Sequence, residues 1–265
     1  MATPTRMAGA RALLAVLAVL LFAAPAGAAV CKRLTEAGES YTVCEVRADE
    51  DLRLFLTAPD GRPYGSFDRL AGALAEGGKR LLFAMNGGMY HPDRRPVGLY
   101  LEDFRQEARI VTSEGPGNFG LLPNGVFCFG DGVLSVIESR RFKEDPPDCR
   151  YASQSGPMLV IGGRLHPRFL AGSASRHIRN GVGVSADGTR AVFAISEQAV
   201  TFHAFASLFR DRLRTPDALY LDGNVSRLYA PGIGRNDAGR PMGPIIGLVE
   251  AGRVRPALTG AASPR

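Results

Sequence analysis

The chain has 265 residues and a formal net charge of +6, and nearly all of its positive charge is arginine, because lysine occurs only at positions 32, 79 and 143. The basic residues are scattered and form no stripe interleaved with aromatic residues, which argues against a nucleic-acid partner. A chain of this length can bury the core of one large domain.

The first 28 residues have the composition of a secretory signal. Arg6 and Arg11 precede an uncharged apolar stretch at 12–24, and the small residues at 26–28 would suit cleavage. The apolar stretch is shorter than the roughly 20 residues that span a bilayer, so we expect its removal and no stable membrane insertion. We therefore predict an exported protein, periplasmic or secreted, in which residues 29–265 form one domain with a charge of 6 − 2 = +4.

Strand-like runs of apolar and β-branched residues recur along the remaining chain. They lie at 41–47, 52–57, 81–85, 98–102, 125–129, 157–161, 181–185, 191–196, 218–221 and 244–249. Asp187 and Gly188 supply hairpin chemistry between two of these runs. The pattern predicts a fold dominated by β-sheet.

Two segments favour helices, 66–76 and 201–212. The second begins at Thr201, a residue type that caps helix N-termini, and it places three phenylalanines on one stripe. Together with the strands, these helices predict a single α+β domain with a mixed or antiparallel β-sheet core and a few flanking helices.

The four cysteines, Cys31, Cys44, Cys128 and Cys149, are an even number in a chain that we expect to be exported. Disulfides are therefore the natural interpretation. Three pairings are possible, and the one between sequence neighbours would close two short loops, each contributing about 3 kcal/mol by the chain-entropy relation.

No metal site is predicted. The sequence contains no Cys-x-x-Cys or His-Glu-x-x-His motif, which are the close ligand spacings that zinc sites favour. We therefore expect no cofactor, although a divalent cation remains compatible with the sequence.

Four segments interrupt apolar runs with small and hydrogen-bonding residues, as happens where a sheet delivers functional groups to its rim. In chain order they are Asn86-Gly87-Gly88-Met89-Tyr90, Ser155-Gly156-Pro157, residues 176–183, and Leu221-Asp222-Gly223-Asn224-Val225-Ser226. We expect them to form the walls of one pocket.

In order and spacing, these segments resemble the phosphodiester glycosidase family over residues 81–249. The resemblance rests on the Asn-Gly-Gly-aromatic turn at Asn86, the Ser-Gly-Pro strand start at Ser155, the Arg-x-x-x-Gly strand from Arg179, and the Leu-Asp-Gly segment. That last segment usually continues with two more small residues before serine, whereas this chain has Asn224 and Val225. The resemblance implies an exported hydrolase that cleaves a sugar-1-phosphodiester at the anomeric carbon.

Asp222, Glu197 and Arg179 are the residues that we expect to act in catalysis. Asp222 follows the buried-looking run at 218–221, where a carboxylate belongs either to a site or to an Asp-Gly turn. Glu197 follows another strand and would be the second carboxylate of a glycosidase pair, activating water. Arg179 has a planar fork that matches two phosphodiester oxygens, and its alternative role is a structural ion pair.

Ten further residues would bind or orient the substrate. Asn86 and Asn180 offer amide groups to sugar hydroxyls, and glycines allow close backbone approach. The complete set is Asn86, Gly87, Gly88, Tyr90, Ser155, Gly156, Asn180, Gly223, Asn224 and Ser226.

Ser155 lacks the Gly-x-Ser-x-Gly elbow of a nucleophile, so we expect it to shape the pocket. Among the four histidines, His177 is the strongest candidate for acid–base chemistry because arginines flank it. Residues 93–95 are expected to lie in a loop over the Asn86 turn.

Two other functions fit the same pocket. One is a non-catalytic glycan-binding protein of the cell envelope, which the Asn224-Val225 departure keeps open because it would reshape the floor of the site. The other is a polysaccharide or cell-wall glycosidase that acts on ordinary glycosidic bonds. A carbohydrate or sugar phosphate is the expected partner in every case.

Overall fold

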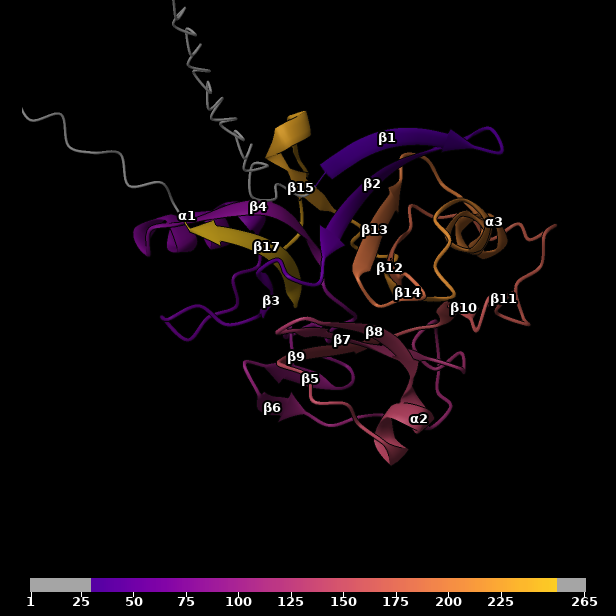
Figure 1. Cartoon of the computed structure of the whole chain (residues 1–265), viewed down its shortest axis with the longest axis horizontal. Coiled ribbons are helices and arrows are strands. Elements are labelled where there is room, and N and C mark those ends of the chain that lie inside the picture. The colour runs from indigo at the N-terminus through magenta and orange to yellow at the C-terminus, as the bar shows by residue number, and fades with distance from the viewer. Residues whose placement is uncertain (1–29, 252–265) are drawn as a thin grey trace, which may run out of the picture.

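Figure 1 shows the computed structural model, which describes residues 30–251. Three antiparallel sheets and a few short helices make up this part of the chain, which confirms the predicted α+β class. The predicted signal at 1–28 lies outside the described residues. None of the helices within 30–251 is long and apolar enough to cross a membrane.

The largest sheet has seven strands and includes the strand that ends at Asp222. Its spatial order is β1 (Val30–Glu36), β2 (Glu39–Arg47), β13 (Arg190–Ser196), β12 (Asn180–Val184), β14 (Asp217–Asp222), β10 (Met158–Ile161) and β11 (Arg164–Leu165). The β12–β13 hairpin turns at Asp187 and Gly188, as its sequence predicts, and Gly188 adopts the positive φ of 69° that glycine tolerates.

The other two sheets have five strands each. The second sheet runs β16 (Arg235–Asn236), β15 (Leu228–Ala230), β4 (Lys79–Asn86), β17 (Ile245–Ala251), β3 (Leu52–Phe55). The third runs β6 (Arg105–Ala108), β5 (Tyr100–Glu102), β9 (Tyr151–Ser155), β7 (Gly125–Gly130), β8 (Val133–Glu138). Every predicted strand run overlaps a strand of the three sheets, while several short or polar strands, including β6 and β16, were not predicted.

Both predicted helices are present. α1 (Phe67–Glu76) begins after Ser66, whose hydroxyl accepts a hydrogen bond from the Arg69 N–H at 3.2 Å. α3 (Phe202–Ser207) begins after Thr201 and continues as the π-helical turn η1 (Leu208–Arg212). The structure adds α2 (Ser139–Glu144) and the 3₁₀ turn η2 (Pro231–Ile233), which were not predicted.

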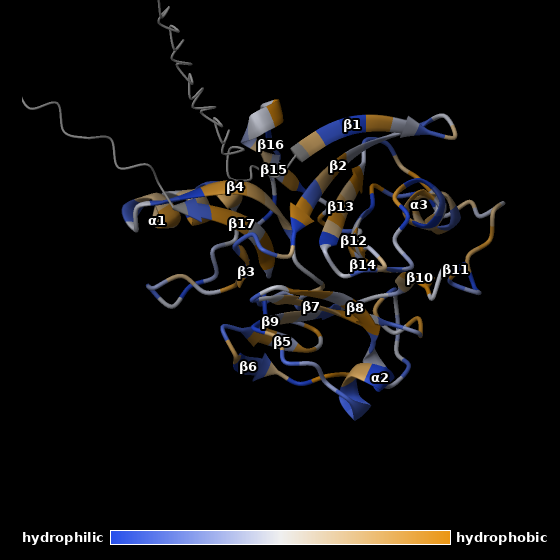
Figure 2. Cartoon of the chain, viewed as in Figure 1, coloured by the Kyte–Doolittle hydropathy of each residue, from blue (hydrophilic) through white to orange (hydrophobic). Residues whose placement is uncertain are grey.

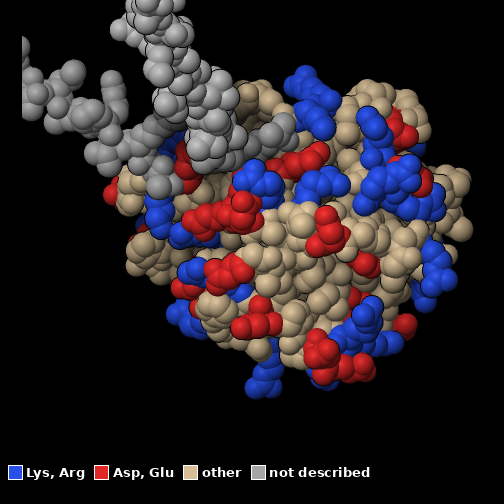
Figure 3. Space-filling model, viewed as in Figure 1, with Lys and Arg blue, Asp and Glu red and all other residues tan. Residues whose placement is uncertain are grey.

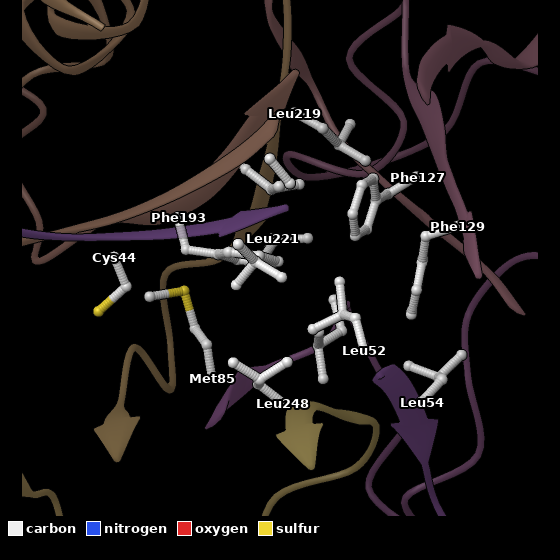
Figure 4. Close-up of a cluster of buried hydrophobic side chains, with 14 of the residues drawn as sticks. Cys44, Leu52, Leu54, Met85, Phe127, Phe129, Phe193, Leu219, Leu221 and Leu248 are labelled. Carbon is white, nitrogen blue, oxygen red and sulfur yellow. The ribbon is translucent and has the colours of Figure 1, made fainter. Parts of the chain in front are cut away.

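A single apolar interior joins the three sheets (Figures 2 and 4). Phe193 of β13 lies at its centre, with its ring centroid 4.9 Å from that of Phe83 of β4 and 5.8 Å from that of Phe127 of β7. Hydrophobic burial at this junction therefore holds the ends of β4, β9 and β14 in a fixed relation.

Two disulfides are present, Cys31–Cys44 and Cys128–Cys149, so the pairing between sequence neighbours is the one that forms. The first crosses the β1–β2 ladder, where the two cysteines are directly opposite. The second ties β7 to the segment that leads into β9. Both lie away from the residues that the motifs single out.

The surface shown in Figure 3 has basic and acidic side chains interspersed, with no continuous basic stripe on that face. Many arginines pair with a carboxylate two residues away, as Arg53 does with Asp51 and Arg62 with Asp60. Each such pair is locally neutral, so little continuous basic surface is left for a polyanion.

Candidate active site

A β-bulge lies at the end of β14, next to Asp222. In the β12–β14 ladder Asn180 lies opposite Asp222, but Gly181 lies opposite Tyr220, so Leu221 is an extra residue on β14. Bulges bend a strand and redirect side chains at the rim of a sheet. Leu221 packs into the apolar interior, whereas Tyr220 and Asp222 both line a cavity.

The Asp222 carboxyl group is only 7% exposed. One of its oxygens accepts a hydrogen bond from the Asn224 N–H at 2.9 Å. Burial raises the pKa of Asp222 above its ordinary value, against the opposing effect of the backbone N–H groups of Asn224, Gly223 and Val225. Among the described residues Asp222 has no ion-pair partner, so its charge is stabilised mainly by the turn that follows it.

Asn86 and Asn180 connect this turn to the second sheet. The Asn180 side-chain oxygen accepts the Asp222 N–H at 3.0 Å, and its amide nitrogen donates to the side-chain oxygen of Asn86. The same Asn86 oxygen accepts the Arg227 N–H at 3.0 Å, and these two donors identify it as the oxygen. Both asparagines are fully buried and do not line the cavity, so their role is to hold the backbone of Asp222 in position.

Strand β9 of the third sheet forms hydrogen bonds to the backbone of two motif segments, the one that contains Gly87 and the one that contains Leu221. The Ser155 hydroxyl donates to the Leu221 carbonyl at 2.7 Å, and the Ser153 hydroxyl donates to the Gly87 carbonyl. A side chain at Gly88 is excluded both by its φ of 146° and by Ser153, which would lie 2.7 Å from a Cβ. These residues build the site without reaching into it.

Two more predicted residues have the same structural role. A Cβ on Gly156 would lie 2.6 Å from that of Asn124, so glycine is needed for packing there. The Ser226 hydroxyl lies 2.8 Å from the Asp222 carbonyl and 3.1 Å from the Ile178 carbonyl, and it closes the turn from below.

The cavity has a volume of about 710 Å³, which is large enough for a sugar with a charged substituent. Four predicted residues line it: Tyr90, Asp222, Gly223 and Asn224. Its other lining residues are Met89, His91, Pro92, Arg94, Val97, Pro116, Gly117, Asn118, Phe119, His177, Tyr220, Val225, Arg240 and Pro241.

The lining is cationic around one acid. Arg94, Arg240, His91 and His177 contribute the basic groups, and among the described lining residues Asp222 is the only carboxylic acid. The Arg94 guanidinium lies over the Tyr90 ring, 5.4 Å from its centroid. Arginines in a partly enclosed cavity are well suited to a phosphate, because their planar forks match two of its oxygens.

Glu197 lies elsewhere. Its side chain accepts hydrogen bonds from the Thr42 hydroxyl and from Arg235, whose guanidinium is 2.7 Å away, and Arg235 also pairs with Asp237. Glu197 does not line the cavity, so the structure does not bring the two predicted carboxylates together in it.

Arg179 is fully buried behind the cavity wall. It donates to the carbonyl oxygens of Val200 at 2.9 Å and Ser175 at 3.3 Å, and its guanidinium carbon lies 3.5 Å from the centroid of the Phe202 ring. Tyr220 lies between this cation and the cavity, so Arg179 does not itself line the space where a ligand would bind.

Several lining residues were not among the predicted site residues. Tyr220 precedes Asp222 by two positions, so strand alternation could have placed it on the same face. Arg94 belongs to the loop expected over the Asn86 turn, and it does reach the cavity. Asn118 and Arg240 lie in loops whose sequences carry no comparable signal.

Within residues 30–251 no group of three or more His, Cys, Asp or Glu side chains is arranged to hold a metal ion.

Comparison with known proteins identifies the class. A family model for phosphodiester glycosidases matches residues 79–249. The protein YigE of Escherichia coli (strain K12) is 34% identical over 222 residues, which cover 84% of this chain and 85% of YigE. The chain therefore belongs to the phosphodiester glycosidase family, a family of glycosidase-type hydrolases, and the resemblance drawn from its motifs is confirmed.

Two solved structures share the fold. The catalytic domain of zebrafish N-acetylglucosamine-1-phosphodiester alpha-N-acetylglucosaminidase superposes with a TM-score of 0.56 at 13% identity, covering 83% of this chain and 81% of that domain. An exported protein from Burkholderia pseudomallei K96243 gives a TM-score of 0.51 at 12% identity, with 79% and 74% coverage. The two disulfides are consistent with an exported protein.

Proposed function

We propose that this protein is an exported hydrolase that cleaves a sugar-1-phosphodiester between the anomeric carbon and the bridging phosphate oxygen. The observation that supports this best is the single buried carboxylate in a cavity lined by basic groups. A carboxylate suits a carbon that becomes positively charged, and arginines suit a phosphate that gains negative charge.

Asp222 is the group that acts on the sugar. In the proposed step the bond between the anomeric carbon and the bridging oxygen breaks, and its electron pair leaves with the phosphate as a phosphomonoester. Asp222 either stabilises the resulting oxocarbenium-like centre or attacks it, and water finally supplies the new hydroxyl group. The Asn86 and Asn180 hydrogen bonds hold the Asp222 backbone during this step.

Arg94 and Arg240 are the groups proposed to bind the phosphate, since both line the cavity. A phosphate leaves more readily than an alcohol, so the reaction depends less on a second carboxylic acid as proton donor. This accounts for a cavity with one carboxylate where ordinary glycosidases need two. His177, which also lines the cavity, is the proposed acceptor of the proton from water.

The test is hydrolysis of a panel of sugar-1-phosphodiesters by the purified mature protein, with a divalent metal chelated or supplied. Asp222→Asn is the matched variant, because the amide oxygen can still accept the Asn224 N–H. We expect free sugar and a phosphomonoester from wild type only. Sugar binding without hydrolysis would instead establish a non-catalytic glycan-binding protein, and release from glycans that lack phosphate would establish an ordinary glycosidase.

A further inference from the structure

Three polar atoms of buried side chains around the site make no hydrogen bond of ordinary geometry among the described residues: the Asn86 side-chain amide nitrogen, the Tyr220 hydroxyl and one terminal nitrogen of Arg179. The last two act on each other, since burial raises the pKa of Tyr220 and contact with Arg179 lowers it. Leaving a buried donor without a partner costs stability, so each such group calls for a reason. Tyr220 and Arg179 are neighbours, with the Arg179 guanidinium carbon 5.6 Å from the centroid of the Tyr220 ring.

Packing does not explain the hydroxyl. The Tyr220 ring meets the edge of Phe202 at a centroid distance of 4.8 Å, a contact that phenylalanine would make equally well. The part of Tyr220 that phenylalanine would lack is its hydroxyl, so a role for this residue beyond packing depends on what the hydroxyl contacts.

The Tyr220 hydroxyl packs against Gly223. A Cβ on Gly223 would lie 1.7 Å from the Tyr220 hydroxyl oxygen and 3.0 Å from the ring carbon that carries it. The φ angle of Gly223 is not in the left-handed region, so its backbone conformation does not require glycine. The hydroxyl oxygen therefore sets the need for glycine, and it lies directly against the turn that follows Asp222.

Arg179 supplies a charge to this contact. Its guanidinium donates to two carbonyl oxygens and also acts on the Tyr220 hydroxyl, and no carboxylate among the described residues pairs with it. Burial is the largest effect on the pKa of Tyr220 and raises it. Arg179 lowers this pKa by its charge and by a side-chain hydrogen-bond contact, and the Asp222 carboxylate raises it. Tyr220 thus lies between a buried cation and the buried carboxylate.

We propose that Tyr220 is a positioning residue for Asp222. Its hydroxyl, which is next to the Arg179 guanidinium, packs against the turn at Gly223 and thereby holds the Asp222 carboxylate in its position in the cavity. The effect of Tyr220 on turnover rests on the function proposed above, but its effect on the position and pKa of the Asp222 carboxyl group does not. The other charged or titratable side chains around Asp222 belong to different elements. They are His91, Arg94 and Tyr90 from the loop after β4, His177 from the segment before β12, Arg227 from the segment before β15, and Arg240 from the loop before β17.

The experiment compares Tyr220→Phe, Gly223→Ala and the double variant. Tyr229→Phe is the control, since Tyr229 packs on Phe67 in the second sheet and does not line the cavity. We expect Tyr220→Phe to lower kcat by roughly 10-fold to 100-fold, the scale of a misplacement of about 1 Å, with KM changed much less. Gly223→Ala should lower kcat by a similar factor when it is made in the wild type. In the Tyr220→Phe background it should cause little further decrease in kcat.

A second readout needs no substrate. The pKa of Asp222, followed by NMR of its side-chain carbonyl carbon, should change in Tyr220→Phe and in Gly223→Ala and stay constant in Tyr229→Phe. If wild type hydrolyses no phosphodiester but this titration shifts, the proposed function fails and the positioning role stands. Unchanged Asp222 titration in Tyr220→Phe, or a Gly223→Ala defect of equal size in both backgrounds, would overturn the role of Tyr220.

Discussion

Strands β13 and β14 lie on either side of β12, and each delivers a carboxylate at or just beyond its end, but the two carboxylates have opposite surroundings. Glu197 after β13 is bound by Arg235 at 2.7 Å and remains 30% exposed. Asp222 at the end of β14 is 7% exposed, has no ion pair among the described residues, and lines a cavity. A neutralised carboxylate holds structure together, whereas a buried one without a cation is available for chemistry.

The difference arises beyond the strands themselves. The short hairpin strand β16 carries Arg235 to Glu197, whereas the Asp222 backbone N–H is held by the buried amide of Asn180 and its carboxylate receives no cation among the described residues. The partners supplied from distant segments therefore separate the two roles.

The strongest test of this comparison exchanges each acid for its amide. Asp222→Asn should lower turnover of the phosphodiester substrate by roughly 100-fold or more, because the proposed reaction needs a charged oxygen at this position. Glu197→Gln should keep turnover within about threefold, since it does not touch the cavity. Initial rates of the two purified variants check both expectations, and a large loss in Glu197→Gln would restore it as a catalytic residue.

Arg94 and Arg240 should matter for the phosphate and not for the sugar. Replacing either by methionine is expected to lower kcat/KM for the phosphodiester by about 10-fold, through the loss of a charge-assisted hydrogen bond. Affinity for the phosphate-free sugar should change much less. Calorimetric titration with the two ligands separates the effects, with Arg105→Met on the exposed strand β6 as the control.

The pH dependence of activity follows from the burial of Asp222. Burial raises its pKa, so the carboxylate is lost as pH falls through a value above that of an ordinary aspartate, about 3.9. We expect the acid limb of the kcat/KM profile to lie above that pH. A limb at or below the ordinary value would show that Asp222 is better stabilised than its 7% exposure implies.

Stability should respond in the opposite direction to activity. A raised folded-state pKa means that the folded protein binds this proton more tightly than the unfolded chain, so the stability contributed is present at low pH and lost as pH rises through the folded pKa. Above that pH, Asp222→Asn removes a buried charge and should not lower the free energy of unfolding. Urea unfolding at neutral pH is the measurement, and a marked loss of stability would contradict it.

Glu197→Gln should give the smallest effect. The ion pair with Arg235 is partly exposed, and such pairs contribute about 0.5–1 kcal/mol. We expect a decrease of that size in the free energy of unfolding, reduced by added salt because ions screen the pair. The same urea experiment at low and high ionic strength checks it.

Much of the fold could be predicted because its signals are local. The apolar runs that became β4, β7 and β14 are long enough to be recognised, and Ser66 and Thr201 cap the two predicted helices. Short strands such as β16, and α2 with its polar sequence, depend on distant partners for their conformation and carry little signal of their own.

Less of the candidate site could be predicted. The motifs identify Asp222 and Tyr90 in the cavity, but most other motif residues, such as Asn86 and Ser155, hold the site from outside it. Several of the residues that give the cavity its charge lie on loops, where Arg240 follows no recognisable pattern. Whether a side chain reaches a cavity depends on tertiary packing, and the order of motifs in a sequence does not predict that packing.

The hydrogen bonds around Asp222 have a consequence for how the protein matures. Asn86 reaches it through Asn180 from the second sheet, and Ser155 reaches the Leu221 carbonyl from the third. The site therefore exists only after all three sheets have assembled, and no fragment of the chain would be active on its own. The activity proposed for this protein would then be acquired only as the last event of folding.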